Sequence, residues 1–209
     1  MAEDAIPRWL AYARELQSLG QIIRTYARSE YDLLNARRLT EMAAEITAAR
    51  AELEHEPLVH NFTAQPGYAT PKVDVRAAVV RDGRILLVQE SSDRRWCMPG
   101  GWADVGVEPA AMVVRETVEE SGFEVEPTKL VGVFDANRGG VPLQFYHAYK
   151  VVMLCRITGG EARTCHETLA VDFFSFDELP PLSRNRTHER HLAEVRAHLE
   201  DPGRPAAFD

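Results

Sequence analysis

Three glutamates in the middle of the chain have the types and spacing of a metal site. Glu116, Glu119 and Glu120 lie three and four residues apart, so a helix would place them on one face. Like charges at this spacing repel one another, and only Arg115 beside them supplies an opposing charge. Clustered carboxylate oxygens bind hard cations such as Mg²⁺, with waters and substrate phosphates completing the shell. We therefore predict a divalent-metal site here; the alternative is an ordinary solvated acidic face.

The segment before these acids predicts a tight loop that leads into a helix. Glycines at positions 100, 101 and 106 allow the backbone to bend or to approach a ligand closely. Pro109 suits the first turn of a helix because its missing N–H would have no partner there, and Gly122 is typical of a helix end. The helix over Pro109–Ser121 would carry its apolar residues on the side opposite the acids, at Ala111, Val114 and Val118.

The pattern around these acids resembles the signature of a known hydrolase family. Gly101 and, fourteen positions later, Arg115–Phe123 resemble the Nudix box, G-x5-E-x7-R-E-U-x-E-E-x-G-U, where U is an aliphatic or bulky apolar residue. The flanking Trp96–Gly101 is also Nudix-like, and the resemblance covers about residues 71–200. The N-terminal part and the 101–106 loop are similar, more narrowly, to bacterial Nudix hydrolases of the CDP-choline pyrophosphatase type. Members of that group carry a helical N-terminal extension associated with dimers.

Two positions depart from the box. Val107 stands where the pattern has glutamate, and Thr117 stands where it has an aliphatic residue. In the family, that first glutamate mainly supports the loop and helix by pairing with the box arginine. We expect Asp104 or Glu108 to replace it as the partner of Arg115.

The resemblance implies roles for the box residues and for one acid outside the box. Glu116 and Glu120 would be the main ligands of Mg²⁺, with Mn²⁺ as the alternative ion, while Glu119 contributes and the Gly100 carbonyl is a backbone ligand. Arg115 would orient a box glutamate through a charge-assisted hydrogen bond. Glu167 occupies a loop before a late strand, where the family often carries the base that activates water. Its alternative role is that of a solvated loop acid.

Three further residues are candidates for contact with substrate, each with a structural alternative. Arg76 would meet a phosphate or the nucleoside, or else be an ordinary strand charge. His147 would face the site or be a half-buried structural histidine. Phe134 would stack on a base or pack in the core. The cluster of Arg184, Arg186 and Arg190 is expected on the surface, and neither histidines nor cysteines have the spacing of a zinc site.

Composition narrows the class of protein. The chain has 209 residues and a net charge of −8, which disfavours a nucleic-acid groove that works by bulk charge but leaves RNA ends as substrates open. No apolar run approaches the ~20 residues that a membrane-spanning helix needs, and the start lacks the features of a secretory signal. Three cysteines without paired spacing suggest reduced thiols. We expect a cytoplasmic protein without membrane contact.

The elements that must position the site fall into two parts. Residues 1–56, with helices over 9–27 and from Tyr31 to near Leu53, form an all-α domain, either an appendage or a homodimerisation element. Residues 57–70 are expected to be an irregular linker, and 71–209 an α+β domain, which the resemblance makes an α/β/α sandwich with a mixed sheet. Its strands are expected at 73–80, 84–89, 123–125, 130–134, 145–157 and 171–176, with helices over 109–121 and after Thr187 as N-cap.

Together these features predict a Mg²⁺-dependent Nudix pyrophosphohydrolase that cleaves a nucleoside diphosphate linked to another group. The narrower resemblance favours CDP-choline. The alternatives are ADP-ribose, and RNA ends or damaged nucleotides. Because Val107 breaks the box, a nucleotide-binding sensor without turnover is the alternative from another class.

Overall fold

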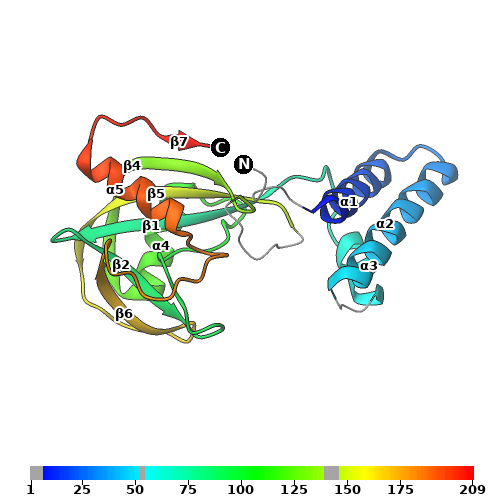
Figure 1. Cartoon of the computed structure of the whole chain (residues 1–209). Coiled ribbons are helices and arrows are strands. Elements are labelled where there is room, and N and C mark those ends of the chain that lie inside the picture. Colours follow the sequence, from blue (N-terminus) through cyan, green and yellow to red (C-terminus); the bar gives the residue numbers. More distant parts are fainter. Residues whose placement is uncertain (1–6, 52–54, 139–145) are drawn as a thin grey trace. The chain divides into compact units, whose positions relative to one another are not determined.

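The computed structural model describes residues 7–51, 55–138 and 146–209. The chain divides into two compact units, Met1–Pro71 and Lys72–Asp209, which are described separately. Figure 1 shows the first unit as helices alone and the second as a sheet accompanied by helices. No helix in the described ranges is long and apolar enough to cross a membrane.

The first unit consists of α1 (Arg8–Tyr26), α2 (Glu30–Ala51) and α3 (His55–Thr63). Helices α1 and α2 approach closely at Gly20, where a Cβ would stand 2.9 Å from the backbone oxygen of Ala36. The two long helices predicted from periodicity are confirmed, although the expected end near Leu53 lies outside the described residues.

The prediction of an irregular segment over 57–70 is wrong for its first half, because α3 continues to Thr63. Pro57 is the third residue of α3. The N–H groups of a first helical turn have no partner within the helix, so proline is tolerated there. Proline therefore marked the start of a helix and not a break.

The second unit is built on a mixed seven-stranded sheet in the order β3-β2-β1-β5-β4-β7, with β6 paired to β2. Its strands are β1 (Lys72–Arg81), β2 (Arg84–Glu90), β3 (Trp96–Cys97), β4 (Phe123–Asp135), β5 (Ala148–Gly160), β6 (Thr168–Ser175) and β7 (Ala207–Phe208). The pairs β1·β5 and β4·β7 are parallel, and the other pairs are antiparallel.

Most predicted strands are present, with changes at their ends. The β1–β2 hairpin turns at Asp82 and Gly83, whose φ angles of 52° and 72° are those of a type I′ turn. The two short strands expected at 123–125 and 130–134 are one strand, β4, because irregularities in its pairing with β5 carry it past Pro127. The predicted start of β5 at Phe145 lies outside the described residues.

Two helices cover opposite faces of this sheet. Helix α4 (Pro109–Ser121) contributes Met112 and Val113 to one core cluster, whereas α5 (Glu189–Glu200) contributes Leu192 and Val195 to another. Strand β1 supplies both clusters, since Ala77 faces the first and its neighbour in sequence faces the second. This alternation produces the α/β/α sandwich expected from the sequence and confirms the predicted fold class.

The N-cap residue of α5 differs from the prediction. His188, not Thr187, is the N-cap, because its Nδ1 accepts from the Arg190 N–H while His191 Nδ1 accepts from the His188 N–H. Thr187 is fully buried and its hydroxyl accepts a hydrogen bond from the Met98 N–H at 2.9 Å. Its side chain therefore ties the α5 loop to the strand that precedes the glycine-rich loop.

Candidate active site

The glycine-rich loop runs along β1 and places the box helix. The Val75 N–H donates to the Gly101 carbonyl and the Ala77 N–H to the Pro99 carbonyl, at 2.9 and 2.8 Å. Gly100 has a φ of 140°, and a Cβ there would stand 2.0 Å from the Val75 carbonyl oxygen. Only glycine permits so close an approach at this φ. The loop therefore depends on Gly100 to lie beside β1.

The same glycine connects the loop to α4. The Gly100 N–H donates to the Glu120 carboxylate at 2.8 Å, and Glu120 is 5% exposed. Gly122, in the left-handed conformation, closes α4 with its N–H donating to the Val118 carbonyl. The carboxylate of Glu120 is thus held by the loop, and its backbone lies in the last turn of a helix that Gly122 ends.

The departure at position 107 is compensated within the loop. Arg115 forms an ion pair with Asp104, as expected, and its Nε lies 4.0 Å from Glu119. Val107 packs against the core cluster beneath α4. Glu108 is instead the N-cap residue of α4, so Asp104 takes the place of the missing glutamate as partner of the arginine.

The buried face of α4 matches the prediction in part, because Val114 packs against the core cluster as expected. Its buried residues are Met112, Val113, Thr117, Glu120 and Ser121, whereas Ala111 is exposed. Thr117 has no exposed surface. It can be buried at little cost because its hydroxyl donates a hydrogen bond to the Val113 carbonyl, at 2.7 Å, within the helix. Glu120 is therefore part of the packed face, whereas Glu116 is half-buried and Glu119 is exposed.

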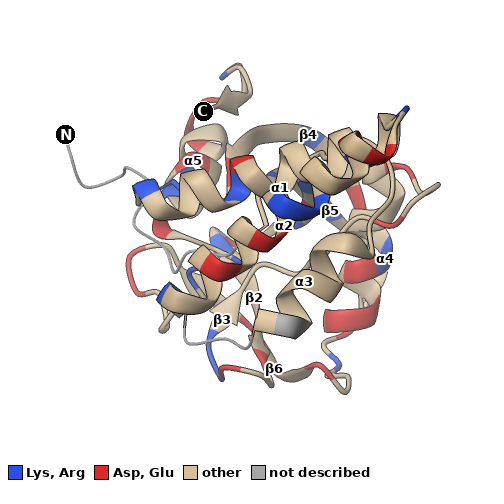
Figure 2. Cartoon of the chain, turned by 90° about the vertical axis from the view of Figure 1, so that its right-hand side faces the viewer, with Lys and Arg blue, Asp and Glu red and all other residues tan. Residues whose placement is uncertain are grey.

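Burial and mutual repulsion act on the box carboxylates. Burial raises the pKa of Glu120 to about 7, although Arg76 and the Gly100 N–H act in the opposite direction. Burial, followed by repulsion from Glu119, raises the pKa of Glu116, and Glu167 adds to this repulsion. A bound cation would relieve both effects, so the donor set has the chemistry of a divalent-metal site. Figure 2 shows this acidic stretch as the red turns of α4.

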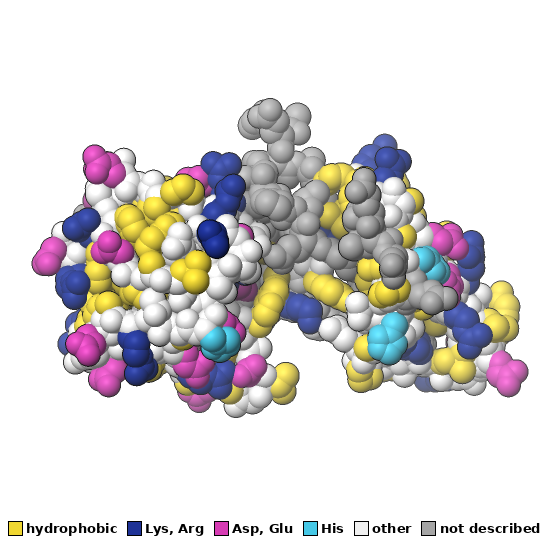
Figure 3. All heavy atoms as spheres, turned by 90° about the horizontal axis from the view of Figure 1, so that it is seen from below, with side chains coloured by type: hydrophobic (Ala, Val, Ile, Leu, Met, Phe, Trp, Pro, Cys, Tyr) yellow, Lys and Arg dark blue, Asp and Glu magenta, His cyan; other side chains and the backbone are white. Residues whose placement is uncertain are grey.

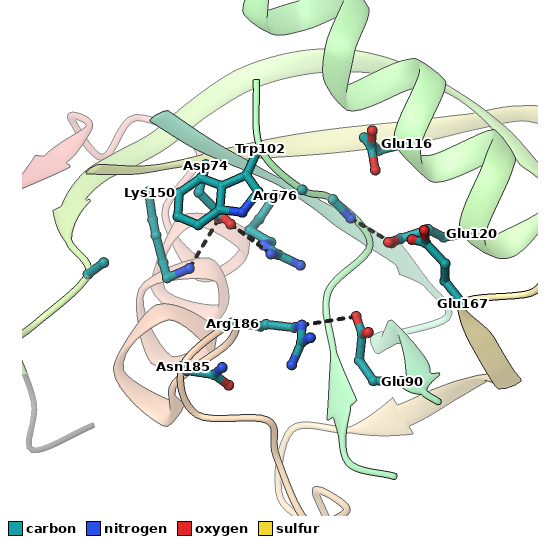
Figure 4. A pocket seen from close by; sticks show the side chains of 13 residues that line it. Asp74, Arg76, Glu90, Trp102, Glu116, Glu120, Lys150, Glu167, Asn185 and Arg186 are labelled. Carbon is teal, nitrogen blue, oxygen red and sulfur yellow. Dashed lines mark hydrogen bonds and ion pairs between the residues drawn. The ribbon is translucent and has the colours of Figure 1, made fainter. Parts of the chain in front are cut away.

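Glu116 and Glu120 line a cleft with a volume of about 330 Å³. Five of the residues predicted from the sequence line it: Arg76, Gly100, Glu116, Glu120 and Glu167. Figure 4 shows Glu116, Glu120 and Glu167 on one side of this cleft and Lys150 on the other, with Arg76 between them. Glu119 and Arg115 are outside the lining and contact each other instead. The fold thus brings the late loop acid to the box.

A buried group of charges forms the floor of the cleft. Asp74 accepts from Arg76 Nε and Nη2 at 2.9 and 2.7 Å, and from Lys150 Nζ at 3.2 Å. The parallel register of β1 and β5 places Asp74 directly beside Lys150. Arg76 is therefore not an ordinary strand charge, because its guanidinium is bound by Asp74 and the Met98 carbonyl at the floor of the cleft.

The loop before α5 supplies a wall of the cleft that sequence reasoning missed. Arg186 and Asn185 line the cleft, so the expectation that the arginine cluster belongs mainly to the surface is wrong for Arg186. Its Nε lies 3.3 Å from Glu90 Oε1, which also accepts from the Cys97 thiol at 3.2 Å. No local sequence signal identifies these residues, because the contacts join segments about a hundred positions apart.

Two predicted substrate residues lie away from the cleft. Phe134 is buried in the core cluster under α5 and packs on His191 with ring centroids 4.9 Å apart, so its ring is not offered to a base. His147 Nε2 lies 3.3 Å from Asp135 Oδ2, and the imidazole does not line the cleft. The structural alternative describes both residues. Trp102, 48% exposed at the cleft, is the aromatic side chain that the lining does present.

Comparison with known proteins agrees with this geometry. Residues 70–195 match the family model described as NUDIX domain, and residues 7–62 match one described as UDP-X-like, N-terminal oligomerisation domain. The chain is 37% identical, over 97% of both chains, to a Bacillus subtilis protein named putative ADP-ribose pyrophosphatase YjhB.

Two solved structures are also similar. One is an ADP-ribose pyrophosphatase from Streptococcus suis, with 39% identity and a TM-score of 0.60 over 67% of this chain and all of that one. The other is a UDP-X diphosphatase, with 27% identity and a TM-score of 0.63 over 97% of this chain and 98% of that one. The second likeness extends over both units of the chain.

The buried floor generates a stability prediction. Asp74→Asn leaves Arg76 and Lys150 side by side without a counter-charge, so we expect the free energy of unfolding to fall by about 3–5 kcal/mol. Denaturant unfolding of wild type and variant measures the difference. The matched control, Asp82→Asn in the exposed β1–β2 turn, should stay within about 0.5 kcal/mol of wild type. An Asp74→Asn variant as stable as the control would contradict the prediction.

Proposed function

The chain belongs to the Nudix family of hydrolases, and on that premise we propose that it cleaves the diphosphate of a nucleoside diphosphate linked to a further group, with ADP-ribose as the favoured substrate. The observation that carries the proposal is the cleft itself. It gathers two box carboxylates, a loop carboxylate and a cationic floor within one cavity, which is the charge pattern that a diphosphate and its cations require.

The names of the relatives support ADP-ribose more than CDP-choline. Two of those described above are named ADP-ribose pyrophosphatases, one of them similar over nearly the full chain. The third is a UDP-X diphosphatase, so a uridine diphosphate conjugate is the second candidate. None of the three is named for CDP-choline, so the narrower resemblance inferred from the N-terminal helices and the 101–106 loop is unsupported.

We propose that Glu116 and Glu120 hold Mg²⁺ together with the Gly100 carbonyl, and that Glu119, which lies outside the cleft lining, assists through its charge and its contact with Arg115. Among the residues that the structure describes, no three His, Cys, Asp or Glu side chains are close enough to hold an ion by themselves. Magnesium commonly binds one or two carboxylates together with waters and substrate phosphates, so this arrangement suits it. When bound, the ion supplies neutralisation of the diphosphate charge and a water of lowered pKa.

The chain's own residues position the groups and move the proton. Glu167 lines the cleft beside the box, and its carboxylate is well exposed to water, so it is placed to accept a proton from an attacking water. The pair Arg115–Asp104 holds the loop that carries Gly100. Trp102 presents an indole at the cleft, which suits stacking on a nucleobase and takes the role once expected of Phe134.

A panel of nucleotides tests the proposed reaction. We expect purified protein with Mg²⁺ to convert ADP-ribose to AMP and ribose 5-phosphate faster than it cleaves a UDP-sugar, CDP-choline or capped RNA, and chelation by EDTA should stop turnover. Chromatography of the phosphorylated products measures each rate. Glu120→Gln keeps the acceptor for the Gly100 N–H but loses the charge, so turnover should fall to background. Glu124→Gln, exposed on β4, is its matched control.

The panel also separates the proposal from its rivals. Micromolar binding of nucleotides without turnover of any of them would indicate a sensor and not an enzyme. Fastest turnover of capped RNA would move the substrate to RNA ends.

The assignment of Glu167 as the base has its own test. Glu167→Gln should lower kcat by about 100-fold, because the amide cannot accept the proton, while KM changes little. Steady-state kinetics measure the two constants separately. Glu161→Gln, an exposed acid of the same loop, should behave as wild type. Wild-type kcat in Glu167→Gln would assign the base to a box glutamate.

We also propose that the chain forms a homodimer through its N-terminal helices. The match of residues 7–62 to an oligomerisation domain supports self-association. Tyr12, Leu19 and Tyr26 recur every seven residues along α1 and are 43–65% exposed, with Leu16 and Ile23 half-buried between them. This spacing is typical of a seam between two helices. In Figure 3, hydrophobic side chains reach the surface of the helical unit at several places.

The seam predicts how the dimer can be broken. Leu19→Glu places a charge in the middle of it, so size-exclusion chromatography should show a dimer for wild type and a monomer for the variant. Ala49→Glu, exposed on α2, introduces the same charge elsewhere and should remain a dimer. A monomeric wild-type protein would remove the dimer from the proposal.

A further inference from the structure

We propose that Lys150 binds an anionic oxygen of the substrate's diphosphate, and that the chain keeps this buried ammonium for that purpose and at the expense of stability. The inference rests on the proposed function and deepens it by assigning a phosphate ligand on the side of the cleft away from the box. It makes Asp74 a positioning residue, which holds the ammonium without neutralising the floor.

The floor of the cleft carries an excess of positive charge. Two cations, Arg76 and Lys150, share the single carboxylate of Asp74, and all three side chains are only 4–5% exposed. A buried charge without a partner lowers the stability of the folded protein. The second buried cation is therefore expected to serve binding and not folding.

The neighbouring titratable groups do not supply the missing negative charge. Burial raises the pKa of the Cys97 thiol well above its usual value, so it stays neutral, and burial keeps the pKa of His191 well below its usual value, so the imidazole adds no charge. Glu120 does act electrostatically on Arg76, but in the proposed function its charge is directed to the cation. An anion from outside the chain would complete the floor.

Lys150 has the larger free hydrogen-bonding capacity of the two cations in the floor. The guanidinium of Arg76 uses four of its five N–H donors, because Nε and Nη2 donate to Asp74 while Nη1 donates to the Met98 carbonyl and, at 3.9 Å, to the Cys97 sulfur. Within the described residues the Lys150 ammonium donates one hydrogen bond, to Asp74, although an ammonium has three N–H donors. Burial lowers the pKa of Lys150 to about 8, so it remains charged at neutral pH. Two donors are therefore available to a ligand in the cleft.

The position of Lys150 suits a diphosphate. In Figure 4 it lies across the cleft from Glu120 and Glu167, on the far side of Arg76. Cations held by the box carboxylates would contact the diphosphate from one side, and Lys150 would contact it from the other. The indole of Trp102 lines the same part of the cleft and belongs to a segment bridged to Asp74. Asp74 therefore contacts both Lys150, the proposed phosphate ligand, and the segment that carries the indole of Trp102.

Binding and stability should respond to Lys150 in opposite ways. Lys150→Met keeps the volume and leaves a neutral, bidentate Asp74–Arg76 pair, so we expect a melting temperature equal to or above that of wild type. The affinity for inorganic pyrophosphate should fall about tenfold or more, because a charge-assisted hydrogen bond is lost. Isothermal titration calorimetry with and without Mg²⁺ measures the affinity, and calorimetric unfolding measures the melting temperature. Lys129→Met, whose ammonium on β4 lies outside the cleft, is the matched control.

Each outcome decides the question. Weaker pyrophosphate binding with unchanged or higher stability supports the proposal, and a raised KM for a cleaved nucleotide would agree with it. A clear loss of stability in Lys150→Met would assign Lys150 a structural role and overturn it. Equal affinity in the two variants, or no binding of pyrophosphate by wild type, would overturn it as well. Because pyrophosphate binding needs no turnover, failure of the proposed reaction would appear separately, in the nucleotide panel.

Discussion

The close passage of Gly100 along β1 is the contact on which the rest of the site depends. A side chain at this position would collide with the Val75 carbonyl, and the Gly100 N–H is the group that binds the buried carboxylate of Glu120. One glycine therefore joins the loop, the central strand and the box helix. Without that approach the carboxylate of Glu120 would lose its hydrogen bond to the loop, and with it a fixed position relative to the cationic floor.

The cleft separates opposite charges instead of pairing them all. Glu116, Glu120 and Glu167 lie together on one side. On the other side the two positive charges of Arg76 and Lys150 face the single negative charge of Asp74. In a partly buried cavity such charges are weakly screened, so each side attracts a ligand of opposite sign. A bound cation would neutralise the carboxylates, and a bound diphosphate would neutralise the excess positive charge of the floor. The unbalanced charges of the cleft therefore agree with the reaction proposed for it.

The loop also shows that a supporting role can move along the sequence. Val107 replaces the glutamate that usually pairs with the box arginine, and it packs in the core beneath α4. Asp104, three residues earlier, makes the ion pair with Arg115 instead. The loop thus brings a carboxylate to the guanidinium from position 104, while position 107 contributes to the core. The chain therefore loses the consensus residue and keeps the interaction.

What the sequence determined by itself was local. The spacing of Glu116 and Glu120, the glycines at both ends of their segment and the Asp-Gly turn between β1 and β2 depend on neighbouring residues, and all were predictable. The buried face of α4, the core position of Phe134 and the floor of Asp74, Arg76 and Lys150 were decided only by tertiary structure. The pairing of Asp74 with Lys150 requires the parallel register of strands 76 positions apart. No periodicity encodes such a register, because it is set by the packing of the whole sheet between its two helices.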